Sequence, residues 1–174
     1  MLDNYNRYNL LKIFLFHSTE SFGLRELARM SEISPPSVMG YLQEFIKQGL
    51  VKRFDKNGSP FYQAERDNAI FREYMKMGVI FEINHSGLAD YLWKELSPEA
   101  IIFYGSFAKG EATEGSDVDL FILGKERKVG LDKFEKKIGL KIHLIFQDDV
   151  KKIPKELKNN LINGIVLRGY LKLF

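Results

Sequence analysis

The stretch GSFAKGEATEGSDVD, residues 105–119, decides how the rest of the chain is interpreted. It follows an apolar run, AIIFY, and ends on two aspartates, Asp117 and Asp119, that are separated by one valine. Alternate residues of a strand point to the same face, so these carboxylates would lie side by side and repel each other. Mg²⁺ is typically held by one or two carboxylates together with substrate phosphates. The pair therefore predicts a site for Mg²⁺ or Mn²⁺.

The start of the same stretch predicts a place for phosphate. Gly105 and Ser106 lie where the apolar strand should turn into a short helix, SFAKGE. Glycine lets the backbone approach a ligand closely, and the N–H groups of a helix start favour an anion. Ser106 adds a hydroxyl, and Lys109 follows one turn later as a counter-charge. Such turns also occur without any ligand, so the aspartates are what make a metal–nucleotide complex the preferred interpretation.

Strands and helices alternate around this stretch. VDLFILG and KIHLIFQ are predicted as two further strands, with helices at about residues 131–138 and 155–163. This pattern is typical of an α+β or α/β domain around a small mixed sheet.

The residues Gly105, Ser106 and Gly110, followed by Ser116-Asp117-Val118-Asp119, closely resemble the signature of polymerase-beta-type nucleotidyltransferases. The resemblance is strongest to the small, minimal branch of that family and covers roughly residues 98 to 170. It implies a nucleotidyltransferase-like domain over residues 98–174, with ATP or another nucleoside triphosphate as substrate. An alternative is a retained turn in which one aspartate is solvated and the other caps a nearby helix.

The resemblance also assigns roles to single residues. It places Gly105, Ser106, Lys109 and Ser116 at the nucleotide, and it makes Asp117 and Asp119 the ligands of divalent ions. Members resembling this branch act as antitoxins paired with a helical toxin, so a helical toxin is an implied partner.

The chain departs from the family at one position. The family uses a third carboxylate from a later strand, and the matching strand here, KIHLIFQ, carries His143 instead. Imidazole can ligate Mn²⁺ or act as a base near neutral pH, but Mg²⁺ prefers oxygen. Three interpretations stay open. His143 is a catalytic ligand or base, a carboxylate from Asp148 or Asp149 substitutes, or transfer is lost and the domain binds a nucleotide or a partner.

The amino-terminal part, residues 1–66, has a different pattern. Ser34 and Pro35 predict the start of a third helix, Gly49 predicts its end, and Asn57-Gly58 predicts a hairpin turn. Three helices followed by a hairpin, with the stretch GLRELARMSEISPPSVMGYLQEFIKQGLVKR, resemble a winged helix-turn-helix domain.

This resemblance implies DNA binding. Ser37 lies early on the third helix, where the family contacts bases, and Lys52, Arg53 and Lys56 lie on the wing, where it contacts phosphates. The other early exposed positions of that helix offer few base-reading groups. The alternative is a winged helix used for dimerisation or protein docking.

A helical connector is predicted between the two domains, over residues 67–97. Its first helix, NAIFREYMKMGVIFEI, is apolar on nearly every side, which predicts burial between the two halves or against a second copy of the chain. We therefore expect a homodimer.

The composition is that of a folded domain protein. The 174 residues are 45% hydrophobic, carry a net charge of +3, and include no cysteine. Disulfides and cysteine-ligated zinc are excluded, and charged residues interrupt every long apolar run, so we expect a cytoplasmic protein without a membrane partner. Two functions follow. One is metal-dependent transfer of a nucleoside monophosphate, and the other is a DNA-binding transcriptional regulator whose carboxyl-terminal domain senses a nucleotide or holds a partner.

Overall fold

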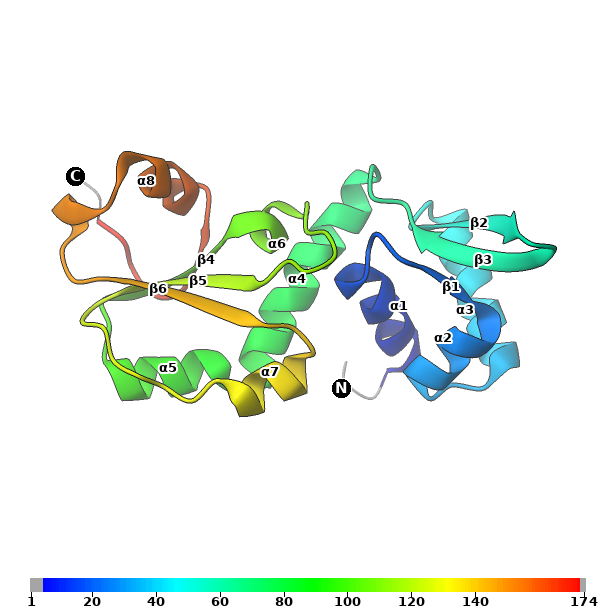
Figure 1. The fold of residues 1–174 in the computed structure, drawn as a ribbon, viewed down its shortest axis with the longest axis horizontal. Coiled ribbons are helices and arrows are strands. Elements are labelled where there is room, and N and C mark those ends of the chain that lie inside the picture. The colour runs from blue at the N-terminus through cyan, green and yellow to red at the C-terminus, as the bar shows by residue number, and fades with distance from the viewer. Residues whose placement is uncertain (1–4, 173–174) are drawn as a thin grey trace. The chain divides into compact units, whose positions relative to one another are not determined.

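The structure is a computed structural model that describes residues 5–172 (Figure 1). The chain forms two compact units. The amino-terminal unit contains the residues up to Gly78 together with Gly110–Glu114, and the carboxyl-terminal unit contains Val79–Lys109 and the residues from Gly115 onward. The predicted connector, residues 67–97, is therefore divided between the two units.

The amino-terminal unit consists of three helices and a small antiparallel sheet. Its elements are α1 (Asn6–Phe16), β1 (Ser21–Gly23), α2 (Leu24–Ser31), α3 (Pro35–Lys47), β2 (Val51–Lys56) and β3 (Ser59–Ala64). The strand order is β1-β3-β2. The three-residue strand β1 was not expected, because it is too short to show a periodic pattern.

The predicted boundaries of α3 are confirmed in part. Pro35 takes the first helical position, where its missing N–H is not needed. Gly49 has φ +68° and ends the helix, with its N–H donating to the Ile46 carbonyl at 2.9 Å. Ser34 occupies the N-cap position, but its side chain does not cap the helix. The Ser34 hydroxyl is instead 3.0 Å from the Ser37 hydroxyl.

The hairpin turn is as predicted. Asn57 and Gly58 both have positive φ, +52° and +75°, which matches the twist of the flanking strands. The hydrophobic core of this unit consists of buried apolar side chains. Within it, the rings of Phe14 and Phe22 pack edge to face, with their centroids 6.0 Å apart.

A loop from the middle of the nucleotide motif, Gly110–Glu114, belongs to the amino-terminal unit. The buried Ser18 hydroxyl donates to the Ala112 carbonyl at 2.9 Å, and the Arg66 guanidinium donates to the carbonyls of Glu111 and Ala112 at 3.2 and 3.3 Å. These bonds fix this segment within the amino-terminal unit.

The carboxyl-terminal unit is built around a four-stranded sheet. Helix α4 (Ala69–His85) runs from the first unit into this one. The other elements are α5 (Leu88–Leu96), β4 (Ala100–Tyr104), α6 (Gly105–Lys109), β5 (Val118–Leu123), α7 (Asp132–Ile138), β6 (Ile142–Gln147), a 3₁₀ turn η2 (Val150–Lys152), α8 (Lys155–Ile162) and β7 (Ile165–Gly169).

The sheet has the order β6-β5-β4-β7, with β5 and β6 parallel and the other neighbours antiparallel. A parallel pair needs a crossover connection, and α7 lies in that connection. All five residues of β4 are buried, because helices cover both faces of the sheet. In Figure 1, α8 lies on one side of the sheet and α5 and α7 lie on the other.

Helix α4 is less buried than its sequence suggested. Phe71, Met75 and Val79 are buried on one face, but Ile70 and Met77 are 56% and 53% exposed. The apolar stripe that faces inward has helical spacing, and Tyr74, Ile80 and Phe81 beside it are partly buried. No helix within residues 5–172 is both long enough and apolar enough to cross a membrane.

Candidate functional site

Three side chains from three strands form a row at one end of the carboxyl-terminal sheet. Asp119 of β5 pairs with Tyr104 of β4 on one side and with His143 of β6 on the other. Strand β4 ends where β5 and β6 begin, so the last residue of β4 meets the first residues of the other two strands. Directly opposed residues share a face of the sheet, which brings the three polar groups together.

Asp119 and His143 are hydrogen-bonded. The imidazole Nδ1 donates to the Asp119 Oδ1 over 3.1 Å, with 24% of the Asp119 side chain and 55% of the His143 side chain exposed. The strand alignment on which the prediction for His143 depended is therefore right. The residue lies beside Asp119, where a third carboxylate was expected.

Gly105 fixes the other side of the Asp119 carboxylate. Its φ is +82°, a conformation that other residues rarely adopt, and a Cβ built on it would collide with Asp119 Oδ2 and lie 2.9 Å from Asp119 Cγ. The glycine is required because the carboxylate lies against the backbone of the turn. Asp119 is thus held between a glycine turn and an imidazole.

Tyr104 is the buried member of the row. Burial, and then the nearby negative charge of Asp119, raise the pKa of the Tyr104 phenol to about 12. Both causes disfavour the phenolate, so Tyr104 is a neutral hydroxyl at physiological pH.

Asp117 lies one position before β5 and is exposed. Lys141 has the corresponding position before β6, across from Asp117. The Val118 N–H donates to the Lys141 carbonyl at 2.8 Å, which fixes this alignment. The pKa of Lys141 is raised mainly by its hydrogen bond to Glu135, with Asp117 as a smaller contribution. Each aspartate of the pair therefore has a nitrogen-bearing side chain opposite it.

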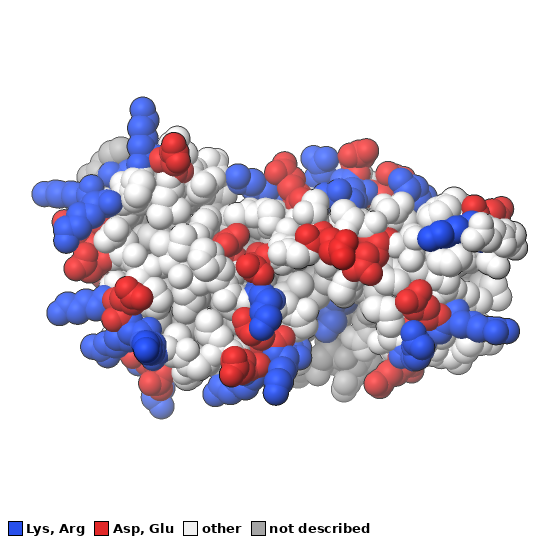
Figure 2. Space-filling model, in the orientation of Figure 1, with Lys and Arg blue, Asp and Glu red and all other residues white. Residues whose placement is uncertain are grey.

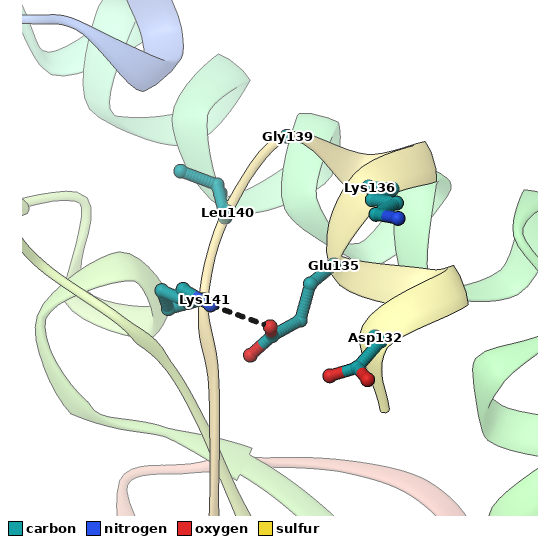
Figure 3. A pocket seen from close by; sticks show the side chains of 6 residues that line it. All are labelled: Asp132, Glu135, Lys136, Gly139, Leu140 and Lys141. Carbon is teal, nitrogen blue, oxygen red and sulfur yellow. Dashed lines mark hydrogen bonds and ion pairs between the residues drawn. The ribbon is translucent and has the colours of Figure 1, made fainter. Parts of the chain in front are cut away.

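Glu135 of α7 holds the start of β6. Its carboxylate accepts hydrogen bonds from Lys141 Nζ at 2.8 Å and from the Ile142 N–H at 3.0 Å, and these bonds lower the pKa of Glu135. Strand β6 is an edge strand, so this N–H would otherwise have no partner in the sheet. Glu135 and Lys141 line a surface hollow of about 410 Å³ together with Asp132, Lys136, Gly139 and Leu140. Figure 3 shows the side chains of these residues.

The remaining predicted nucleotide residues lie in the loop between β4 and β5. Ser106 is in the first turn of α6 and is partly buried, and Ser116 is partly buried just before Asp117. Lys109 is exposed, and its Nζ donates to Asn160 Oδ1 of α8 at 3.3 Å.

The residues present do not fit a complete metal centre. Among residues 5–172, no group of three or more histidine, cysteine, aspartate or glutamate side chains is placed to hold a metal ion. Asp148 and Asp149 cannot supply the third carboxylate beside Asp119. They follow Gln147, which pairs with Leu123 at the far end of β5, about 13 Å along the strand from Asp119 at about 3.3 Å per residue.

The predicted DNA-binding residues all lie on the surface of the amino-terminal unit. Lys52 and Lys56 point to one face of β2, and Arg53 points to the other. Lys52 Nζ is 3.8 Å from Glu65 and Arg53 is 3.9 Å from Asp55, so acidic groups accompany both. Ser37 is exposed early on α3. Figure 2 shows basic and acidic groups interspersed on the face that it draws.

Tyr104, Lys141 and Glu135 were not predicted as neighbours of the site. A signal for Lys141 is present in the sequence. The alternation Lys-Ile-His in residues 141–143 matches Asp-Val-Asp in residues 117–119 once the two strands are paired in parallel. Tyr104 could have been found as the last residue of the strand before Gly105. Glu135 gave no signal, because its role depends on how α7 folds back onto β6.

Comparison with known proteins supports the assignment of this unit. Residues 87–167 match the family model of the nucleotidyltransferase domain. This match supports the prediction of a nucleotidyltransferase-like domain in the carboxyl-terminal part of the chain. The match begins at residue 87, earlier than the predicted boundary at residue 98, and so it includes α5. No curated protein and no solved structure matches the chain.

Proposed function

We propose that this chain is a DNA-binding regulator whose nucleotidyltransferase domain holds a nucleoside triphosphate such as ATP as a ligand, without transferring its nucleoside monophosphate. The observation that carries this proposal is the hydrogen bond between His143 and Asp119, at the position where transfer would need a third carboxylate. A two-metal transfer needs ligands for both ions, and this chain offers two carboxylates there.

Nucleotide binding is supported by the family match and by the geometry of the turn after β4. The match includes Gly105 and Ser106, and Ser106 lies directly after the Gly105 turn, in the first turn of α6. These features concern binding and not the chemical step.

The binding test uses an ATP analogue with a methylene bridge between the α- and β-phosphates, which cannot be transferred. Isothermal titration calorimetry in Mg²⁺ buffer should give saturable binding that weakens in Ser106→Ala and stays unchanged in Ser59→Ala. Ser59 is an exposed serine at the start of β3. Absence of binding by the unchanged protein would refute the proposal.

DNA binding is proposed for the amino-terminal unit. It is supported by the order of its elements, three helices with a hairpin after the third, as in a winged helix-turn-helix domain. The exposed basic side chains of β2 support phosphate contacts. A gel-shift experiment with the DNA upstream of the chain's own gene should give a complex whose affinity falls steeply with salt. No complex at low salt would contradict this part.

A second candidate function is the transfer reaction itself, with Mg²⁺ or Mn²⁺ at Asp117 and Asp119. It is favoured by the retention of both aspartates beside Gly105 and Ser106 in the matched range. Incubation with α-labelled ATP and either ion would then label an acceptor, and Asp117→Asn would abolish the labelling. We expect no labelling, and labelling that depends on Asp117 would replace the first proposal by this one.

We also propose that the chain forms a homodimer, and a helical toxin is a further proposed partner. The dimer is supported by Ile70 and Met77, which are seven residues apart on α4 and expose apolar side chains on one face of that helix. Light scattering after size exclusion should give twice the mass of the chain, and a monomer for the double variant Ile70→Ser/Met77→Ser. A monomeric unchanged protein would refute the dimer.

A further inference from the structure

Both aspartates of the motif already have a nitrogen-bearing group opposite them. Asp119 accepts a hydrogen bond from His143 Nδ1 at 3.1 Å, and Asp117 lies at the level of Lys141 across the same pair of strands. The Lys141 ammonium is itself paired with Glu135 Oε2 at 2.8 Å. Like charges one residue apart on a strand need a compensating group, and the group in contact with this pair is the His143 imidazole.

These contacts leave little for a free cation to bind. The Asp119 oxygen that faces β6 is bonded to the imidazole, and the other oxygen lies against the backbone of Gly105. The side chain at position 143 offers an imidazole, with Nδ1 already bonded to Asp119, where Mg²⁺ favours oxygen.

A single substitution at position 143 would change the ligand atoms beside Asp119. The residue lies directly opposite Asp119 in the parallel pair, and more than half of its side chain is exposed, at 55%. A carboxylate there would join Asp117 and Asp119 without disturbing the core. It would remove the imidazole hydrogen bond and place three carboxylates at the start of two neighbouring strands.

We propose that the His143 imidazole takes the place of a divalent cation beside Asp119, and that the residue at position 143 decides whether the aspartate pair binds such an ion. The site then has no affinity for a free divalent ion, and an aspartate at position 143 creates that affinity. The inference rests on the proposed function and deepens it. It concerns the same site, and it names the residue because of which the site holds a nucleotide without transferring it.

The test uses Mn²⁺ alone, without nucleotide, on the full chain. Electron paramagnetic resonance of free Mn²⁺ measures binding to the unchanged protein, to His143→Asp and to His143→Asn. His143→Asn is the matched control, because it removes the same imidazole without adding a carboxylate. We expect no saturable site in the unchanged protein or in His143→Asn. We expect a saturable site in His143→Asp, with an affinity at least about tenfold higher than any binding by His143→Asn, since carboxylate count tunes the affinity of such sites.

Two results would overturn the inference. One is a saturable Mn²⁺ site in the unchanged protein that Asp119→Asn removes, and this arm does not depend on any variant folding. The other is Mn²⁺ binding by His143→Asp that is no tighter than binding by His143→Asn, once circular dichroism shows both variants folded. Failure of the inference and failure of the proposed function are distinguishable, because the latter is decided by binding of the methylene analogue to the unchanged protein.

Discussion

The aspartate pair of the carboxyl-terminal unit and the basic side chains of the β2–β3 hairpin differ in how firmly they are held. Both are charged groups at the start of a short strand or along its length. Asp119 is 24% exposed and is fixed by a glycine turn and an imidazole. Lys52 and Arg53 are at least half exposed, and their acidic partners lie near the limit of an ion pair, at 3.8 and 3.9 Å. The first arrangement positions a charge, whereas the second only presents charge to solvent.

The difference predicts where a substitution will matter. A change beside Asp119 must alter packing, backbone conformation and charge together. A change on the hairpin alters charge alone, because exposed ion pairs contribute about 0–1 kcal/mol.

The largest effect is expected for Gly105→Ala. Gly105 and Gly115 have nearly the same φ, +82° and +76°, but a Cβ on Gly115 would meet no atom within 4 Å, whereas one on Gly105 would collide with Asp119. Gly115→Ala should lower the free energy of unfolding by about 1 kcal/mol from backbone strain alone. Gly105→Ala should lower it by about 3 kcal/mol, because overpacking adds to the strain.

Urea unfolding of both variants measures the two costs. Equal losses for Gly105→Ala and Gly115→Ala would show that the Asp119 carboxylate is not held against the turn, and would remove the contrast between the two regions.

The next effect concerns Tyr104 at alkaline pH. Its pKa is raised from 10.0 to about 12, so above pH 10 the unfolded chain releases a proton that the folded protein still holds. The contribution of Tyr104 to the free energy of unfolding is complete below pH 10. It is lost as the pH rises toward 12, by about 2–3 kcal/mol in total. Urea unfolding from pH 8 to 11.5 should show this fall, and Tyr104→Phe should reduce it.

Tyr170→Phe is the control for Tyr104, because Tyr170 is 75% exposed. If removing that exposed phenol flattened the alkaline profile as much as Tyr104→Phe does, the buried position beside Asp119 would not be the cause.

A smaller effect is expected for Glu135→Gln. The pKa of Glu135 is lowered by its bonds to Lys141 and to the Ile142 N–H, so its stabilising contribution is present above its ordinary pKa of 4.5 and is lost as the pH falls. At neutral pH the substitution should cost about 1 kcal/mol, the typical contribution of a hydrogen bond. Between neutral pH and pH 3 the unchanged protein should lose more stability than the variant.

Glu126→Gln, in the exposed loop after β5, removes a carboxylate without either bond and serves as the comparison for Glu135. A loss of stability for Glu126→Gln that matched that of Glu135→Gln would mean that the start of β6 does not depend on the Glu135 carboxylate.

The smallest effect on stability is expected on the hairpin. Lys52→Gln/Arg53→Gln should change the free energy of unfolding by less than about 0.5 kcal/mol, since both side chains are exposed. Its effect should lie in DNA binding, where the slope of log affinity against log salt should become shallower by about 2. Lys125→Gln/Lys128→Gln makes the same change of charge in the loop after β5 and should leave the slope unchanged. Equal slopes for both double variants would refute phosphate contacts by β2.

Local sequence signals predicted much of the fold. The third helix could be bounded from Pro35 and Gly49, and the hairpin from Asn57-Gly58, because each of these features acts within a few residues. The apolar runs at residues 100–104, 118–123 and 142–147 were found as strands for the same reason. Strand β7 was not found as a strand, because it is short and pairs with β4 more than sixty residues earlier.

For the candidate site, the sequence by itself determined the glycine–serine turn, the aspartate pair and the histidine at the level of the missing carboxylate, since all three follow from the order of residues and the alternation of strands. Only the tertiary structure decided what surrounds Asp119. The sheet order brings Tyr104 and His143 to its two sides, and α7 folds back so that Glu135 holds Lys141 and the start of β6. Pairing of strands and packing of helices are non-local, so the neighbours of a charge, and with them its chemistry, were settled only when the chain folded.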